Sequence, residues 1–373
     1  MRCGIFGGSF DPVHSEHVKL VERAIEALSL DKVYVLPAKI SPFKQDGALA
    51  SETDRLEMCK IAFRGNPRVE VSSYELKQEG TSYSYLTCRY FKQQFPNDTL
   101  YFLMGGDCFC GFSKWKNPKE ILGCVQLAVY NRKGQDIASA LKEFQERFGR
   151  EVIVLPFAGE AVSSTRLRVE LAFGKTPAGM DGEVLAYLRK KGLYSHPAVL
   201  PALSLEKPAR QEHSFRVACL AAERAIREGI SQEKAILAGA LHDCGKYVPL
   251  DSPMLEGFVL PHDVPAPVVH QYTGAYLAER QFGITDEEIL DAIRYHTSGK
   301  ENMTSLGKLI FLADMLEEGR DFAGIEGLRA AFEKGLDEGM LACLESQLAF
   351  LKAEGKPIYP LTERAYKRLK QEK

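Results

Sequence analysis

The stretch GIFGGSFDPVHSEHVKL, residues 4–20, joins an apolar run to a glycine pair and two histidines, His14 and His17. The apolar run predicts a buried strand that ends at Gly7 and Gly8, and the apolar spacing after His17 predicts a helix. Glycines allow a close backbone approach to a phosphate, and the start of a helix offers free N–H groups and a positive dipole end. Because residues three apart share a helix face, both imidazoles can point at one anion. We therefore expect a phosphate site at this turn.

The first half of the chain alternates strand patterns with helix patterns. Four further apolar runs predict buried strands, at residues 32–36, 100–104, 125–130 and 152–155. Ser51 with Asp54 forms a capping box that predicts the start of another helix. Such alternation implies a parallel sheet with right-handed crossovers, and ligands bind beyond the carboxyl ends of its strands.

The pattern changes at residues 195–208, which contain three prolines and little periodicity. Beyond this segment the apolar spacing is helical, and Thr285 with Glu288 is expected to cap one helix. The predicted fold is an α/β domain with a parallel sheet, followed by an all-α domain. We place the domains at residues 1–195 and 208–373, with a linker at 196–207.

Length and composition agree with a globular chain of two domains. The 373 residues are too many for one ordinary core, and 45% are hydrophobic and 26% charged. The net charge of -2 gives no basic field for nucleic acid, and no apolar run is long enough to span a membrane. Nine cysteines occur without a C-x-x-C pair and no signal segment is evident, so we expect reduced thiols in the cytoplasm. A homo-oligomer is compatible with these numbers, which do not specify one.

Two motifs of the first domain resemble those of the nucleotidyltransferase superfamily. GGSFDPVHSEH, residues 7–17, resembles its G-G-x-F-D-P-x-H-x-G-H signature, and SSTRLR, residues 163–168, resembles its S-S-T-x-I-R phosphate clamp. Further segments look like nicotinate mononucleotide adenylyltransferase, namely SPFK before RLEM, EGTSYS, LMGGD, Trp115 and YNRKG. The resemblance covers nearly all of residues 1–195 and implies a Rossmann-like fold. An isolated H-x-x-H pair is more often a surface or capping pair, but these flanking motifs favour the functional interpretation.

The resemblance implies transfer of AMP from ATP to nicotinate mononucleotide, with release of pyrophosphate. Positioning and charge stabilisation suffice for this reaction, and no covalent enzyme intermediate is needed. The implied catalytic groups are a magnesium ion and the side chains of His14, His17, Lys44 and Arg168. The implied contacts to ATP and its phosphates are Gly7, Gly8, Ser9, Phe10, His14, His17, Gly105, Asp107, Ser163, Ser164, Thr165 and Arg168. The implied contacts to the nicotinate nucleotide are Ser82, Tyr83, Ser84, Trp115 and Arg132.

The first domain departs from the family pattern at three positions. Glu16 stands where the family has glycine, and its carboxylate would lie near a triphosphate unless it turns to solvent. Phe43 replaces a histidine before Lys44, and Ser84 replaces a threonine. The choice between nicotinate and nicotinamide mononucleotide therefore stays open. Another acceptor, such as pantetheine phosphate, is disfavoured by Trp115 and the EGTSYS segment.

A second group of histidines lies in the second domain. His242 and Asp243 are adjacent on an apolar helix, where buried polar side chains need partners, and a metal ion is one. The histidines recur at intervals of 26 to 29 residues, which places one on each successive helix. Four imidazoles and two carboxylates can hold two divalent ions, with Asp243 bridging them. The predicted ligands are His213, His242, Asp243, His270, His296 and Asp314.

This ligand set resembles that of the HD phosphohydrolase superfamily, and Lys246 matches the lysine of its H-D-x-x-K form. Residues 270–275 and 292–320 look like the bacterial HD family that cleaves diadenosine tetraphosphate symmetrically to two ADP. The resemblance implies two iron ions with Asp243 and Lys246 as catalytic residues, whereas the ligand types alone also admit manganese. Lys246, Arg294 or Arg320 could neutralise the polyphosphate, and spacing does not choose among them.

The sequence therefore predicts a bifunctional enzyme that binds ATP, nicotinate mononucleotide and diadenosine tetraphosphate, and neither nucleic acid nor a membrane. One alternative keeps the folds but gives the HD domain a guanosine polyphosphate or a deoxynucleotide as substrate. Another makes the HD domain a nucleotide-sensing module without catalysis. The complete set of predicted ligands weighs against that module.

Overall fold

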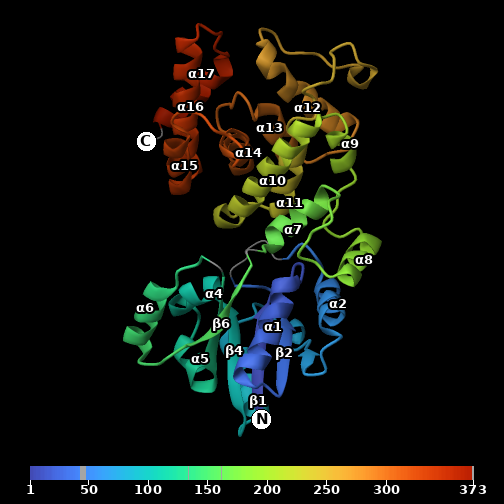
Figure 1. The fold of residues 1–373 in the computed structure, drawn as a ribbon. Helices are drawn as coiled ribbons and strands as arrows, with labels where there is room; N and C mark the ends of the chain where they lie inside the picture. The colour runs from blue at the N-terminus through green and yellow to red at the C-terminus, as the bar shows by residue number, and fades with distance from the viewer. Residues whose placement is uncertain (43–47, 133, 161, 372–373) are drawn as a thin grey trace. The chain divides into compact units, whose positions relative to one another are not determined.

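The computed structural model describes the chain except residues 43–47, 133, 161, 372 and 373. It forms two compact units, and the chain passes between them three times (Figure 1). The first unit consists of Met1–Leu167 with Pro177–Leu193, and the second of Arg168–Thr176 with Tyr194–Lys373. This grouping does not test which segments fold independently, so the predicted domain limits at residues 195 and 208 stay a prediction.

The first unit is built on a six-stranded sheet in the order β3-β2-β1-β4-β5-β6. Every neighbouring pair of strands is parallel, as the alternation of strand and helix predicted. The strands are β1 (Arg2–Gly8), β2 (Lys32–Pro37), β3 (Val69–Val71), β4 (Thr99–Gly105), β5 (Gln126–Arg132) and β6 (Ile153–Gly159). The strand order reverses between β1 and β4, which is where an open parallel sheet binds its ligand.

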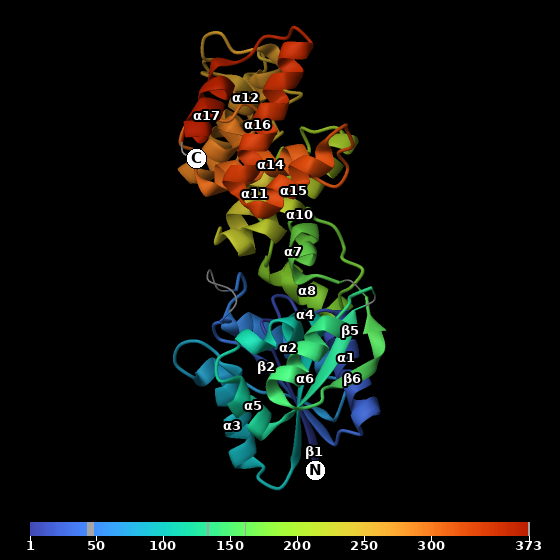
Figure 2. The ribbon, with the colours of Figure 1, turned by 90° about the vertical axis from the view of Figure 1, so that its left-hand side faces the viewer.

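Helices cover both faces of this sheet. On one face, apolar side chains of α3, α5 and α6 pack on β1, β4 and β5, and Figure 2 shows α3 beside α5. On the other face, α1 contacts β1, β2 and β6, while α2 contacts β2 and β3. The helices of this part of the chain are α1 (Ser15–Leu28), α2 (Glu52–Phe63), η1 (Glu75–Lys77), α3 (Ser84–Gln94), α4 (Gly106–Cys110), η2 (Phe112–Lys114), α5 (Pro118–Cys124), α6 (Ala138–Phe148), α7 (Ser164–Ala172) and α8 (Gly182–Lys191).

The central strand β1 is fixed by close packing around its first glycine. A Cβ on Gly4 would lie 3.0 Å from the Leu30 side chain, 3.1 Å from Val33 and 3.2 Å from Leu103. Only glycine therefore lets β1 sit this close to its neighbours. Helix α1 begins directly beyond the strand, so the glycine pair and both histidines of residues 4–20 lie at the carboxyl edge of the sheet.

The second unit is helical, and its described residues contain no strand, as predicted. Helices α10, α11, α13 and α14 pack together around one apolar core. The helices are α9 (Val199–Leu203), α10 (Pro208–Glu228), α11 (Gln232–Leu241), η3 (Pro253–Leu255), η4 (Ala266–Val268), α12 (Val269–Arg280), α13 (Glu287–Tyr295), α14 (Ser305–Leu316), α15 (Ile325–Lys334), α16 (Leu336–Ala353) and α17 (Pro360–Gln371). Among the described helices, none has both the length and the apolarity that a membrane crossing requires.

The structure tests two predicted helix N-caps, one for α2 and one for α13. Ser51 caps α2 by accepting a hydrogen bond from the Asp54 N–H, as expected. The prediction that Thr285 caps α13 was wrong, because Asp286 is the N-cap and its carboxylate accepts the N–H groups of Glu288 and Ile289. Aspartate at residue 286 competes directly with the neighbouring threonine for the same N–H groups, and both residue types are good caps.

Candidate active sites

A pocket of about 270 Å³ lies at the carboxyl edge of the sheet in the first unit. The ends of β1 and β4 and the first turn of α1 contribute to its walls. Its lining is Phe6, Gly7, Gly8, Ser9, Phe10, His14, Glu16, His17, Leu20, Phe102, Met104, Gly105, Asp107, Cys108, Trp115, Tyr130, Glu160 and Ser164. Ten of the predicted nucleotide-site residues are thus brought together in one pocket.

The two histidines of the phosphate motif are stacked on each other. Their ring centroids are 3.7 Å apart, with His14 buried as the N-cap of α1 and His17 in its first turn. The Nδ1 atom of His17 accepts a hydrogen bond from the His14 backbone N–H at 3.2 Å. A neutral His17 therefore carries its proton on Nε2, and this N–H group is a hydrogen-bond donor.

Two buried charged residues hold the loop between the glycines and α1. Arg55, which is fully buried in α2, donates from Nη1 to the Ser9 carbonyl at 2.8 Å. Asp11 accepts the backbone N–H groups of Leu49 and Ala50, each at 3.0 Å. These bonds fix the backbone that the phosphates would approach.

A second cavity of about 410 Å³ lies near the predicted pyridine site. Tyr83, Ser84 and Trp115 line it together, and the Lys116 ammonium lies 4.2 Å from the Tyr83 ring centroid. The Ser82 hydroxyl accepts the backbone N–H of Lys39 at 2.9 Å. Because Trp115 lines both cavities, it stands between the phosphate region and the aromatic cavity.

Five further predicted residues are not in the lining that the structure describes for either cavity, namely Ser163, Thr165, Lys44, Arg132 and Arg168. Lys44 lies outside the described residues, and so does the side chain of Arg132. Arg168 is buried, belongs to the second unit and donates from Nη2 to the Gln232 Oε1 atom at 2.5 Å. Its role as a phosphate ligand therefore stays a prediction.

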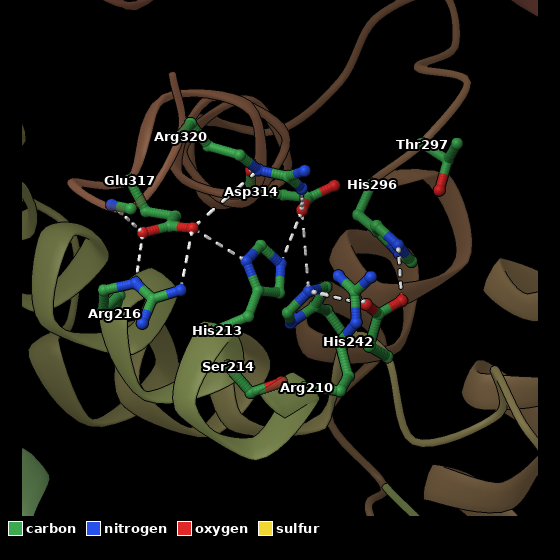
Figure 3. A network of polar contacts seen from close by, with 12 residues as sticks. Arg210, His213, Ser214, Arg216, His242, His296, Thr297, Asp314, Glu317 and Arg320 are labelled. Carbon is green, nitrogen blue, oxygen red and sulfur yellow. Dashed lines mark hydrogen bonds and ion pairs between the residues drawn. The ribbon is translucent and has the colours of Figure 1, made fainter. Parts of the chain in front are cut away.

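All six predicted metal ligands converge in the second unit. Two overlapping groups can each hold an ion, namely His213, His242 and Asp314, and His242, Asp243 and His296. The sixth residue, His270, has its Nε2 atom 3.1 Å from both the Asp243 Oδ1 atom and the His296 Nε2 atom. Figure 3 shows His213 and His242 directed at Asp314, with His296 near His242.

Hydrogen bonds on the outer ring nitrogens orient three of these histidines. The Nδ1 atoms of His242 and His296 each lie 2.8 Å from a backbone carbonyl one turn earlier, Gly239 and Ile293. The Nδ1 atom of His213 lies 3.0 Å from the Glu317 carboxylate. The carbonyls therefore keep the proton on Nδ1 of His242 and His296, so their Nε2 atoms present lone pairs to the centre, and Glu317 would keep it on Nδ1 of His213 when Nε2 binds an ion.

The chemistry of the inner atoms fits a divalent metal. The Nε2 atom of His242 is buried and has no hydrogen-bond partner among the described residues. Burial lowers the pKa of His242 to about 3 and also lowers that of His270, so both rings are neutral near pH 7. Burial alone would raise the pKa values of Asp243 and Asp314, but the surrounding histidines lower both below the ordinary range. Neutral imidazoles beside ionised carboxylates are the ligands that divalent transition metals prefer.

Basic side chains surround this centre. Two residues that support it, Arg210 and Glu317, were not predicted from the sequence. Lys246 lies 3.2 Å from Asp243, and Arg320 lies 2.8 Å from Asp314. Arg210 also lies 3.0 Å from Asp243, and its position three residues before His213 on one helix was the available signal. By contrast, Arg294 lies beside Asp291, at 3.8 Å.

The second missed residue is Glu317, which lies behind His213. Its carboxylate is 1% exposed and also binds the Arg216 guanidinium. Figure 3 shows Glu317 between Arg216 and His213. Its spacing of three residues from Asp314 gave a weak signal, because Glu318 beside it has the same chemistry.

Two family models match the chain, one for each unit. The cytidylyltransferase-like model matches residues 5–170, and the HD domain model matches residues 210–319. The chain therefore combines a nucleotidyltransferase domain of Rossmann-like fold with an HD domain, as the sequence motifs implied.

Two curated relatives match most of the chain, and a third matches about half of it. A protein of Mycoplasma pneumoniae named "Probable nicotinate-nucleotide adenylyltransferase/Ap4A hydrolase" is 32% identical over 84% of this chain and 88% of its own length. Its namesake in Mycoplasma genitalium is 30% identical over 85% of this chain and 87% of its own length. A "Probable nicotinate-nucleotide adenylyltransferase" of Dictyoglomus thermophilum is 37% identical over 52% of this chain and its whole length. The chain belongs to the family of two-domain nicotinate-nucleotide adenylyltransferase/Ap4A hydrolases.

Proposed function

We propose that the protein is a bifunctional enzyme of adenine nucleotide chemistry. Its first unit transfers AMP from ATP to nicotinate mononucleotide and releases pyrophosphate. Its second unit hydrolyses diadenosine tetraphosphate symmetrically to two ADP. The observation that carries the proposal is the convergence of both residue sets, since the pocket gathers the histidines with Trp115 and the helical unit gathers six metal ligands.

In the transferase site, the stacked histidines and the glycine pair act on the phosphates. The Nε2–H of His17 donates to an oxygen of the triphosphate, and the first N–H groups of α1 add to this stabilisation. Trp115, Tyr83 and Ser84 hold the pyridine ring of the acceptor, so that its phosphate meets the α-phosphorus near His14. Lys44, Arg132 and Arg168 are proposed to neutralise phosphate charge, and magnesium accompanies ATP.

In the hydrolase site, the residues would hold two divalent ions, for which we propose iron. Bound there, the ions would supply a nucleophilic water and Lewis-acid stabilisation of the phosphate charge. His213, His242 and His296 would present the lone pairs of Nε2 to the ions, His242 belongs to both ligand groups, and Asp243 lies 3.1 Å from His270. Lys246, Arg210 and Arg320, which now lie on the ligand carboxylates, are the cations that would accept a polyphosphate.

Two finer points belong to this proposal. The relatives' names favour diadenosine tetraphosphate over a guanosine polyphosphate or a deoxynucleotide, and nicotinate mononucleotide over other acceptors. All nine cysteines are free thiols, which agrees with an enzyme of the reducing cytoplasm. The homo-oligomeric state stays a prediction.

The two activities are tested together with a pair of crossed variants. His17→Ala should lower AMP transfer by about 100- to 1000-fold and leave tetraphosphate hydrolysis unchanged. His242→Ala should abolish hydrolysis to ADP and leave the transfer unchanged. Purified protein with iron(II) or manganese(II) is given each substrate, and the products are separated by ion exchange. AMP with ATP as hydrolysis products would contradict symmetrical cleavage, and metal-loaded protein without turnover would favour a sensing role.

A further inference from the structure

The carboxylate of Glu16 lies in the wall of the nucleotide pocket, where no role has been assigned to it. Glu16 is 7% exposed and therefore does not turn to solvent, although it sits between the two phosphate-handling histidines. A buried carboxylate needs partners that offset its lost hydration. Its partners determine what else it can bind.

Protein groups hold this carboxylate in one place. Its Oε2 atom accepts the Glu160 backbone N–H at 2.8 Å and lies 3.5 Å from the Tyr130 hydroxyl. Its Oε1 atom binds the Lys19 ammonium at 2.8 Å, one turn further along α1. The close approach to β6 requires glycine at residue 159, because a Cβ there would lie 2.6 Å from Oε2. Lys19 offsets the negative charge, so the side chain adds little repulsion toward a triphosphate.

The lining of the pocket indicates which of the two nucleosides lies against the wall that contains Glu16. The phosphates of both substrates must meet near His14 and His17, so their bases extend away from that point. Trp115 marks the side of the acceptor, because it also lines the cavity of Tyr83. The base of the nucleoside triphosphate then lies on the remaining side, along Glu16, Tyr130 and Glu160.

We infer that Glu16 is a specificity residue that selects a 6-aminopurine for the donor nucleotide. A carboxylate has about four acceptor positions, and the described donors use three of them. The remaining position can accept from the exocyclic amino group of adenine. A 6-oxopurine presents an oxygen there, which the carboxylate repels. This inference rests on the proposed AMP transfer but concerns the base of the donor alone.

The test compares ATP with inosine triphosphate, whose base has an oxygen in place of the 6-amino group and a proton on N1. Trp115 is the single tryptophan of the chain and lines the pocket, so its fluorescence reports binding at this site and not at the HD site. Wild-type protein should bind ATP at least 10-fold more tightly than inosine triphosphate, as expected for a hydrogen bond to a charged group. Glu16→Gln should bring the two affinities within about 3-fold of each other, because an amide can donate to the 6-oxygen.

A matched control and a second variant keep the outcome decisive. Glu26→Gln, an exposed change on the same helix, should keep the wild-type ratio. Glu16→Asp keeps the charge but is one methylene shorter, and it should also lower the ratio, which covers a failure of Glu16→Gln to fold. An unchanged ratio in the folded Glu16 variants, or equal affinities in wild-type protein, would overturn the inference. Because binding needs no acceptor, this result is separate from the AMP-transfer assay, whose failure would contradict the proposed function instead.

Discussion

Replacing Glu317 by glutamine should weaken metal binding although Glu317 is not a ligand. The carboxylate accepts from His213 Nδ1 at 3.0 Å with one oxygen and binds Arg216 with the other. An amide has one oxygen and one NH₂ group, so it can satisfy only one of these two donors. If the NH₂ group faces His213, the imidazole proton moves to Nε2 and blocks the ligand nitrogen. If it faces Arg216, a half-buried cation loses its partner and the support behind His213 loosens.

The expected magnitude follows from the position of Glu317 behind a ligand. Loss of such a partner typically weakens metal affinity by 10- to 100-fold, which equals about 1.4–2.8 kcal/mol. The assay is competition for manganese(II) between the full-length protein and a chromogenic chelator, and it needs no turnover. Glu318→Gln is the matched control, because Glu318 is the adjacent, exposed glutamate. Equal manganese affinities for Glu317→Gln, Glu318→Gln and wild-type protein would refute the reasoning.

Four further substitutions test the packing and the charge of the fold. Burial raises the pKa of the Glu206 carboxyl group to about 8, although the hydrogen bond from Ser214 lowers it. The protonated carboxyl group therefore stabilises the folded state. This contribution is fully present below about pH 4.5 and is lost as pH rises through about 8. Between pH 5 and pH 9, wild-type protein should lose up to about 4 kcal/mol of unfolding free energy relative to Glu206→Gln in urea titrations, and parallel curves would contradict this. Gly245→Ala should destabilise the HD domain by at least about 3 kcal/mol in thermal unfolding, because its Cβ would lie 2.4 Å from the Gly274 nitrogen. Gly327→Ala, with nothing within 4 Å, should instead stabilise α15 by up to about 1 kcal/mol, so similar effects at both glycines would contradict the packing argument. Gly159→Ala should weaken ATP binding by at least 10-fold in Trp115 fluorescence titrations, because its Cβ would lie 2.5 Å from the Tyr130 ring. Unchanged affinity for ATP would show that β6 can shift to accommodate the methyl group.

Strong periodic patterns predicted the parallel sheet and the helical second domain. The strand β3 was not predicted, because its sequence pattern is weak. The five longer strands contain apolar runs, whereas β3 (Val69–Val71) has three residues with a glutamate in the middle. That strand exists because it pairs with β2, which a local pattern does not reveal.

The convergence of the six candidate ligands was predictable because four of them are histidines, a rare residue type, at regular intervals. The residues that support the candidate ligands, Arg210 and Glu317, were harder to predict, since glutamate and arginine are common on helix surfaces. Glu317 is 1% exposed while Glu318 is exposed, and the two are adjacent. Only tertiary packing decides which of two neighbouring glutamates faces a histidine.

Helix α7 bears on how the chain can be dissected in the laboratory. Its first residue, Ser164, lines the nucleotide pocket, while Val169, Ala172 and Phe173 belong to the apolar core of the helical unit. Phe173 packs edge-on against Phe215, with ring centroids 5.4 Å apart. A fragment that stops at residue 195 would expose these apolar side chains to water and tend to aggregate. Recombinant work on either activity should therefore begin with point variants of the whole chain rather than with excised halves.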